Sequence, residues 1–253
     1  MHLHELDQFA DGSSWLHTWD PRVKLISLSA LVIVLVLLPS LAAALAGFAC
    51  ALFLLRLSGI PLGFVAVHLR RAFLFLGLMA AVLCITVPGT PLLQWWVWTI
   101  SREGLRLGAL ILVRGMNAVV VVLVMIGTQR FETALHSLQS LHVPSPIVQL
   151  LMFSYRYLFL FLGETDRLFT AARSRGWHFR ARISSLATFG NLLGMLLVRS
   201  FERTERIRVA MLSRGYQGRV MVLQRFQAGR LDFIKALIIG GLAASLLLLG
   251  WIT

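Results

Sequence analysis

Five apolar stretches alternate along the chain with short polar or turn-forming segments. Long runs of aliphatic and aromatic residues predict helices that cross a membrane. We place these spans at about 25–38, 41–57, 72–87, 104–127 and 233–251. The first two runs are short, which is compatible with a tight hairpin buried among the other helices. Asp20 and Pro21, just before the first span, are typical of a helix start because they supply an N-cap and a first-turn proline.

The pattern changes between the fourth and fifth spans, from Thr128 to about Arg230. An apolar stripe predicts a short amphipathic helix over about 131–141, which ends before a proline-rich turn. A longer helix follows over about 147–175, apolar at first and charged later, and another over about 185–214. Along one face of this last helix, arginines recur at helical spacing, namely Arg199, Arg203, Arg206 and Arg214.

These elements predict an all-α integral membrane protein with about five transmembrane helices. A cytosolic region of long amphipathic helices lies between spans four and five. The chain then has three parts: residues 1–127 with the N-terminal segment and four spans, residues 128–230 with the cytosolic helices, and residues 231–253 with the last span. Composition agrees, because 58% of the residues are hydrophobic and only 14% are charged, against about 25% charged in soluble domains.

The net charge of +13 bears on the orientation of the chain. In a soluble protein such a charge would suggest a nucleic-acid partner, but here the positive residues mainly adjoin the spans, as the positive-inside rule describes. With a cytosolic N-terminus, 21 of the 24 lysines and arginines face the cytosol, leaving Arg102 and Arg106 outside and Arg114 within the fourth span. The polar first 20 residues lack the pattern of a cleavable signal peptide. We expect no nucleic-acid partner, and a multi-pass protein of a bacterial-type cell (inner) membrane with its N-terminus inside and its C-terminus outside.

Residues that would carry catalysis are missing from the pattern. The spans hold no paired carboxylates, and the chain has neither a GxxxxGK[ST] phosphate loop nor an HExxH motif. We therefore expect no catalytic site, no cofactor and no metal bound by this chain. Both cysteines, Cys50 and Cys84, sit in apolar runs and are expected to be small buried hydrophobes. The histidines near the N-terminus and in the cytosolic region are expected to be solvated: His2, His4, His17, His136, His142 and His178.

Arg114 is the one strong charge inside a span, and Asn117 follows it one turn later. Burying such a charge costs at least about 2.5–3.5 kcal/mol on insertion scales, so a polar partner is expected. The alternative is that Arg114 snorkels or lines a protein-filled interior. A structural contact is favoured over a transport role, because a substrate path normally needs more than one such residue.

A short motif occurs twice in the cytosolic region, with an offset of 39 residues. Its pattern is Ala-x-x-Ser-Arg-Gly-aromatic, at 171–177 and again at 210–216, and the charged residues upstream also match. Glycine just past a helix end and arginine in its last turn are ordinary capping residues. Two copies with matching flanks favour a paired docking device over capping alone. The candidate residues are Ser174, Arg175 and Gly176 in the first copy, and Ser213, Arg214 and Gly215 in the second.

The chain resembles the transmembrane (T) component of energy-coupling-factor transporters, a class of ABC-type importers, over nearly its whole length. The resemblance rests on the stretch Trp19 to Leu25, on Leu138, Leu141 and Pro144 at their spacing, on Tyr155 to Phe159, and on the two repeats. Within that family, the segments 193–203 and 114–118 are similar to the cobalt-type (CbiQ-like) branch.

The resemblance implies the rest of a transporter. The two repeats would be coupling motifs, each received by one of two cytosolic ATPase subunits, which would bind ATP and Mg. A small membrane (S) subunit would bind the substrate, cobalt in this branch with nickel close by. This chain would be a scaffold without a ligand of its own.

The alternative class of function is a multi-span membrane enzyme, or a scaffold protein whose basic helices lie on anionic lipid headgroups. Each basic residue near such a surface contributes about 1 kcal/mol. A lipid role gives no reason for the repeated Ser-Arg-Gly-aromatic ends, and an enzyme needs polar residues clustered in the spans. Co-purification with ATPase and small membrane subunits distinguishes these classes.

Overall fold

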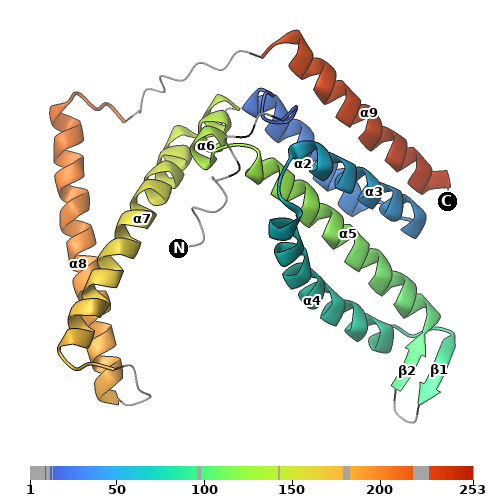
Figure 1. Ribbon diagram of the computed structural model, residues 1–253, viewed down its shortest axis with the longest axis horizontal. Helices are drawn as coiled ribbons and strands as arrows, with labels where there is room; N and C mark the ends of the chain where they lie inside the picture. Colours follow the sequence, from blue (N-terminus) through green and yellow to red (C-terminus); the bar gives the residue numbers. More distant parts are fainter. Residues whose placement is uncertain are drawn as a thin grey trace. The chain divides into compact units, whose positions relative to one another are not determined.

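The structure, a computed structural model, describes residues 9, 12, 14–95, 98–141, 143–178, 183–218 and 228–252. The chain forms two compact units, one from residues 1–137 and 225–253 and one from residues 138–224. The fold is the all-α membrane fold that the sequence predicts, with one short β-hairpin added (Figure 1).

The first unit contains five long helices and the hairpin. In chain order these are α2 (Pro21–Leu37), α3 (Leu41–Ser58), α4 (Leu62–Thr86), β1 (Pro91–Trp95), β2 (Trp98–Ser101), α5 (Arg102–Gly127) and α9 (Arg230–Ile252). Their starts follow local chemistry, because Asp20, Ser40 and Ser101 each accept a hydrogen bond from a first-turn amide of α2, α3 and α5. Helix α6 (Phe131–Ser140) begins in this unit.

Five helices of the described chain are long and apolar enough to cross a membrane: α3, α4, α5, α7 (Ser145–Ser174) and α9. Four of them contain predicted spans. The first predicted span lies in α2, whose 17 residues are at the lower limit for crossing. Helix α7 qualifies by length and composition although the sequence pattern assigned it to the cytosolic region. The protein is a multi-pass membrane protein.

Two local differences from the expected elements have clear causes. Helix α4 begins at Leu62, ten residues before the apolar run at Ala72, because the polar His68, Arg70 and Arg71 continue a helix without interrupting it. The tryptophan-rich segment after α4, for which the apolar pattern predicts no element, forms the antiparallel pair β1–β2, with Trp95 opposite Trp98. Trp96 lies outside the described residues.

Helix α5 is the centre of the first unit and packs against α2, α3 and α4, while α9 packs against α2 and α3 (Figure 1). The buried core joins Leu28, Leu31 and Leu35 of α2 to apolar residues of α5, namely Val120, Val121 and Val124. Helices α4 and α5 approach closely because Gly104 and Gly108 present no side chain to α4. Small residues at helix contacts are typical of membrane proteins, where close backbone packing drives association.

The second unit is an antiparallel pair of long helices, α7 and α8 (Ile183–Ser213). Glu164 of α7 forms an ion pair with Arg199 of α8. Gln149, near the start of α7, contacts Tyr216 and Gly218, which follow the end of α8. The ion pair joins the second half of α7 to the middle of α8, and the Gln149 contacts join the start of α7 to the end of α8. Both helices lie within two residues of the predicted bounds.

The close approach of α4 and α5 predicts a specific sensitivity to one methyl group. A Cβ atom on Gly108 would lie 2.9 Å from the carbonyl oxygen of Ala80, so Gly108→Ala forces backbones apart and should cost about 1–3 kcal/mol. Gly77→Ala on α4 is the matched control, because nothing lies within 4 Å of its Cβ position. Thermal unfolding of the purified protein in detergent should show a lower midpoint for Gly108→Ala alone. Equal midpoints for the two variants contradict this packing.

Candidate functional site

The two copies of the repeated motif end α7 and α8 with the same backbone geometry. In the first, the amides of Gly176 and Trp177 donate to the carbonyls of Arg173 (2.9 Å) and Ala172 (3.1 Å). In the second, Gly215 and Tyr216 donate to Leu212 (3.0 Å) and Met211 (3.0 Å). This is the Schellman arrangement of a helix C-terminus. The φ angles of Gly176 (81°) and Gly215 (80°) explain the glycines, because other residues rarely adopt them.

The helix caps are formed by backbone groups and do not involve the side chains of Arg175 and Arg214. Ser174 and Ser213 donate hydrogen bonds back to carbonyls of their own helices, at 3.0 and 2.9 Å. Arg175 and Arg214 are exposed, and among the described residues neither side chain makes a hydrogen bond or ion pair. We call Ser174–Arg175–Gly176 the first tip and Ser213–Arg214–Gly215 the second tip. Each tip presents one free guanidinium on a fixed backbone.

The aromatic residue of each motif fastens its tip to the other helix. After the first tip, Trp177 stacks on Phe169 at 6.0 Å between ring centroids, and Phe169 stacks on Phe189 of α8 at 6.1 Å. After the second tip, the Tyr216 hydroxyl donates to Gln149 Oε1 of α7 at 2.6 Å. Both ends of the helix pair are therefore closed, one by aromatic rings and the other by a hydrogen bond.

Gln149 connects the second tip to the beginning of α7. Its Nε2 donates to the Ser145 hydroxyl (2.9 Å) and to the Gly218 carbonyl (3.2 Å), while its Oε1 accepts from Tyr216. Gln149 itself is buried. A buried amide that is hydrogen-bonded through both its nitrogen and its oxygen holds its neighbours in one arrangement. The sequence pattern gave no sign of this role, because a lone glutamine in an apolar helix has no motif.

The antiparallel arrangement sets the two tips at opposite ends of the pair. Helix α8 has 31 residues, which corresponds to about 46 Å at 1.5 Å per residue. Two guanidinium groups at that separation cannot enter one binding pocket. They can engage two separate sites.

Two other arginines of α8 are paired. Arg208 donates to Glu205 at 2.6 and 3.0 Å, and these hydrogen bonds lower the pKa of Glu205. The same contact raises the pKa of Arg208. Arg199 pairs with Glu164 of α7. The unpaired tip arginines thus differ from neighbours that find acidic partners within the chain.

Arg114 and Asn117 lie on α5, in the unit that does not contain the tips. Arg114 donates a hydrogen bond to the carbonyl of Leu38, just past the end of α2. Asn117 is fully buried, and its Nδ2 donates to the Ala44 carbonyl of α3 at 2.9 Å. A helix end leaves backbone carbonyls without intrahelical partners. Arg114 supplies such a partner where α2 turns into α3.

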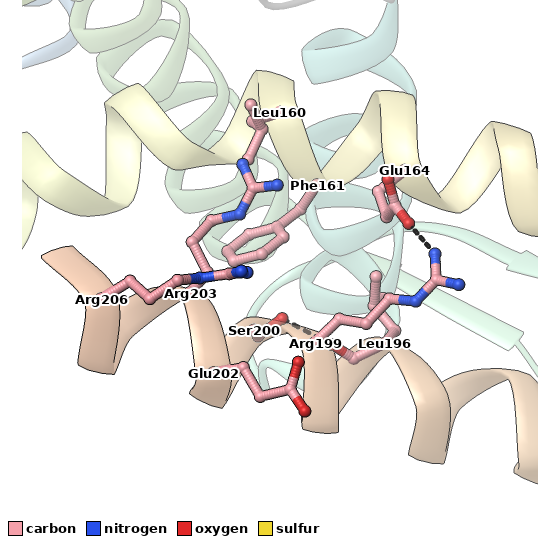
Figure 2. Close-up of a pocket in the computed structure, with 9 residues that line it drawn as sticks. All are labelled: Leu160, Phe161, Glu164, Leu196, Arg199, Ser200, Glu202, Arg203 and Arg206. Carbon is pink, nitrogen blue, oxygen red and sulfur yellow. Dashed lines mark hydrogen bonds and ion pairs between the residues drawn. The ribbon is translucent and has the colours of Figure 1, made fainter.

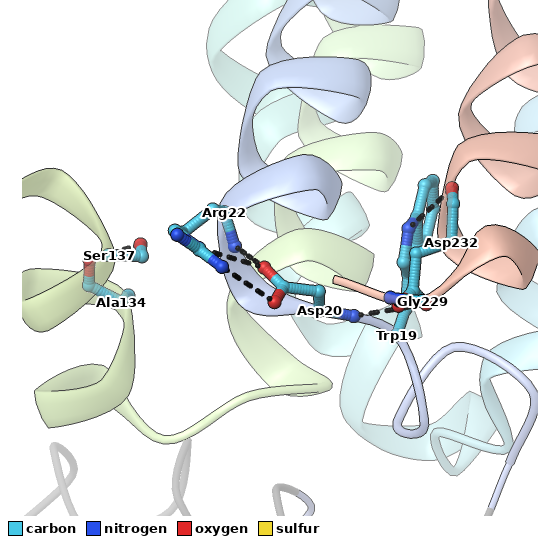
Figure 3. A network of polar contacts seen from close by, with 7 residues as sticks. All are labelled: Trp19, Asp20, Arg22, Ala134, Ser137, Gly229 and Asp232. Atoms are coloured by element: carbon cyan, nitrogen blue, oxygen red, sulfur yellow. Dashed lines mark hydrogen bonds and ion pairs between the residues drawn. The ribbon is translucent and has the colours of Figure 1, made fainter. Parts of the chain in front are cut away.

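From the sequence, the stretch around Trp19 is a helix start and part of a family pattern, and no tertiary contact is predicted for it. The structure shows such contacts (Figure 3): the Trp19 indole donates to the Asp232 carbonyl at 3.2 Å, and the Asp20 amide donates to Asp232 Oδ1 at 3.3 Å. Lys24 Nζ donates to the Thr128 carbonyl at 3.0 Å. These contacts join the start of α2 to the start of α9 and the end of α5.

A second lysine strengthens the same junction. Lys235 of α9 donates to the Trp15 carbonyl (3.0 Å) and the Thr18 hydroxyl (3.2 Å), and its Nζ lies 5.0 Å from the Trp15 ring centroid. An ammonium group over an indole ring is a favourable cation–π contact. Hydrophobic periodicity cannot reveal such contacts, because the partners are more than 200 residues apart.

The histidines expected to be solvated have mixed outcomes. His2, His4 and His142 lie outside the described residues. His17 is hydrogen-bonded, through Nδ1 to Ser14 Oγ (2.6 Å) and through Nε2 to the Phe9 carbonyl (2.8 Å). Within the described ranges, no three histidine, cysteine or acidic residues lie close enough to hold a metal ion.

Comparison with known proteins gives consistent matches over most of the chain. The profile of the CbiQ family, described as cobalt transport protein, matches residues 12–223. The energy-coupling factor transporter transmembrane protein EcfT of Lacticaseibacillus paracasei is 30% identical over 226 residues, 84% of this chain and 85% of that protein. The protein of the same name from Brevibacillus brevis is 31% identical over 231 residues, 85% of each chain.

A further relative is the putative fused cobalt transport protein CbiMQ of Methanocorpusculum labreanum. It is 31% identical over 181 residues, which cover 67% of this chain and 30% of that longer protein.

The hydrogen bond from Tyr216 predicts a local effect at the second tip. Tyr216→Phe removes a contact of about 1 kcal/mol, so the last turn of α8 should open about fivefold more often. Hydrogen–deuterium exchange of a peptide spanning the second tip should accelerate by that factor. Tyr157→Phe is the control, since the Tyr157 hydroxyl has no hydrogen bond within the described chain. Identical exchange in the two variants argues against Tyr216 as the fastener.

Proposed function

Because the chain belongs to the CbiQ family of cobalt transport proteins, we propose that it is the subunit that transmits motion from ATPases to a substrate-binding partner in an energy-coupling-factor importer. It is the transmembrane (T) component of a transporter and not an enzyme, like the relatives that it matches along most of its length. The alternatives of a membrane enzyme or a lipid-surface scaffold are not favoured by these relatives.

The observation that carries the proposal is the pair of free arginines on equivalent tips. Arg175 and Arg214 sit on identical helix caps at opposite ends of one helix pair. Because the two tips are far apart, each can bind a different cytosolic ATPase subunit. Those subunits bind ATP and Mg, and their movement displaces the tips of this chain.

Guanidinium chemistry suits this contact. A planar, permanently charged guanidinium can donate several hydrogen bonds at once to carboxylates or carbonyls in a groove. Trp177 contacts α8 through Phe169, and Tyr216 contacts α7 directly. A displacement of either tip therefore acts on the contacts between α7 and α8 and shifts one helix relative to the other.

Charge placement supports a cytosolic position for α7 and α8. The second half of α8 carries Arg199, Glu202, Arg203, Glu205, Arg206 and Arg208. These residues lie beside the middle of α7, where Arg199 pairs with Glu164, and where Arg203 and Arg206 line cavities together with Tyr157, Leu160 and Phe161. If α7 crossed the bilayer with α8 paired to it, these charges would enter the hydrocarbon, at about 2.5–3.5 kcal/mol for each basic or acidic residue at the centre. We place the pair on the cytosolic side, with α2, α3, α4, α5 and α9 crossing.

The arrangement of α2 and α9 supports opposite locations for the two chain ends. Their starts meet through Trp19, Asp20 and Asp232. Near their ends, a Cβ atom on Gly250 would lie 2.9 Å from Pro39. The two helices are therefore parallel, and both cross in the same direction. We propose that the N-terminus is cytosolic and the C-terminus extracytosolic.

The proposed substrate is Co2+, with Ni2+ as the nearest alternative, bound by a small membrane (S) subunit. The support is the description of the matching family and of the fused CbiMQ relative, both of which name cobalt.

The tips predict a coupling defect without a folding defect. Arg175→Ala or Arg214→Ala should leave a folded membrane protein, while loss of one member of a desolvated charge pair weakens ATPase binding by about 2–5 kcal/mol. The double variant should lose more, because both contacts of a bivalent platform are gone. Pull-down of the ATPases measures their association with each variant. Uptake of Co2+, compared with uptake of Ni2+, by vesicles that contain the assembled transporter measures transport.

Arg167→Ala is the matched control for this experiment. Arg167 is exposed on α7 and makes no ion pair within the described chain, so its removal should cost about 0–1 kcal/mol. Normal association and uptake in both tip variants, or equal defects in all three proteins, contradict the docking role.

Reporter fusions test the proposed orientation. A reporter inserted directly after Gly127 and one inserted between α7 and α8 should both be active in the cytosol. A reporter after Thr253 should be active only outside. An extracytosolic reporter between α7 and α8 means that α7 crosses the membrane, and a cytosolic C-terminus rules out the five-span arrangement.

A further inference from the structure

A groove between α7 and α8 has a free pair of cations at its centre (Figure 2). Two adjoining cavities of about 230 and 390 Å³ share Arg203 and Arg206 of α8. The first is walled on the α7 side by Leu160 and Phe161, and the second by Tyr157. Cationic and apolar surfaces thus meet in one continuous groove.

The two arginines are unpaired, unlike their neighbours. Arg199 is held by Glu164, and Arg208 is held by Glu205. Within the described part of the chain, the side chains of Arg203 and Arg206 make no hydrogen bond and no ion pair. Figure 2 shows both extending from α8 toward Phe161, while the carboxylate of Glu202 points the other way. The groove therefore has two guanidinium groups available for an anion.

We propose that this groove binds the phosphate headgroup of an acidic phospholipid. Arg203 and Arg206 lie three residues apart on α8 and line the same two cavities. Guanidinium groups recognise phosphate with paired hydrogen bonds. Leu160, Phe161 and Tyr157 offer apolar walls for the glycerol and the first acyl carbons. Lipid binding at this groove is a function additional to ATPase coupling, and the proposal rests on the proposed position of the helix pair at the cytosolic membrane surface.

Two further observations favour a lipid over a free phosphate. The groove lies where α7 changes from an apolar first half to a charged second half, at Glu164. Within the groove, the apolar wall residue Leu160 is 41% exposed. A phosphate from solution has no use for apolar walls, whereas a lipid headgroup brings an apolar body with it.

Native mass spectrometry of the full-length protein in detergent tests this site. Phosphatidylglycerol is titrated against phosphatidylcholine, and Arg203→Gln/Arg206→Gln is compared with Arg167→Gln/Arg208→Gln, which removes the same charge from outside the groove. We expect the dissociation constant for phosphatidylglycerol to rise about 30-fold in the groove variant, about fivefold for each arginine. The control variant should bind like the unmodified protein.

Three results overturn the proposal. Equal losses in the two double variants mean that only net charge attracts the lipid. Unchanged binding in the groove variant means that the lipid lies elsewhere. Displacement of phosphatidylglycerol by millimolar inorganic phosphate means that the groove takes a free anion. Because the ATPases are absent from this measurement, its failure leaves the coupling role of Arg175 and Arg214 untouched, and a failure of coupling leaves the binding result unchanged.

Discussion

The antiparallel pairing of α7 and α8 is the constraint on which the account depends. The Glu164–Arg199 ion pair joins the helices between their ends. The Phe169–Phe189 stack and the hydrogen bond from Tyr216 to Gln149 join them near their two ends. Pairing in this direction separates Arg175 from Arg214 by the length of a helix. It also lays charged segments beside apolar ones, which makes a membrane crossing by the pair costly. The proposal of two separate ATPase contacts and the proposal of a surface position both rest on this pairing.

In the first unit, polar contacts fix helix ends and apolar contacts fill the space between them. Asp232, Lys235 and Lys24 join the starts of α2 and α9 and the end of α5. Arg114 joins the opposite end of α2 to the middle of α5. Because α2 and α9 are fastened at both ends, a rigid body of parallel and antiparallel helices results. Such a body can hold its shape while a separate unit is moved by partners.

Much of this was predictable from the sequence because helix periodicity and capping are local. The bounds of α6, α7 and α8 follow from apolar stripes and from turn residues such as Pro144 and Gly176. The repeat predicted the two helix ends that carry Arg175 and Arg214, and equal local sequences form equal caps there. What the pattern missed depends on distant partners, as with Gln149 and the residues that meet Asp232. The start of α4 was also missed, because an apolar run marks the part of a helix suited to lipid and not its first turn.

The central claim is that the tips move with the ATPases, and a distance between the tips tests it most directly. Ala171 and Ala210 are exposed and equivalent in the repeat, so cysteines at these positions can carry spin labels once Cys50 and Cys84 are replaced. Pulsed electron paramagnetic resonance of the assembled transporter then compares the nucleotide-free and ATP-bound states. We expect a shifted distance distribution with ATP, and no shift when Arg175 and Arg214 are both alanine. The same distribution in both nucleotide states of the unmodified tips would contradict it.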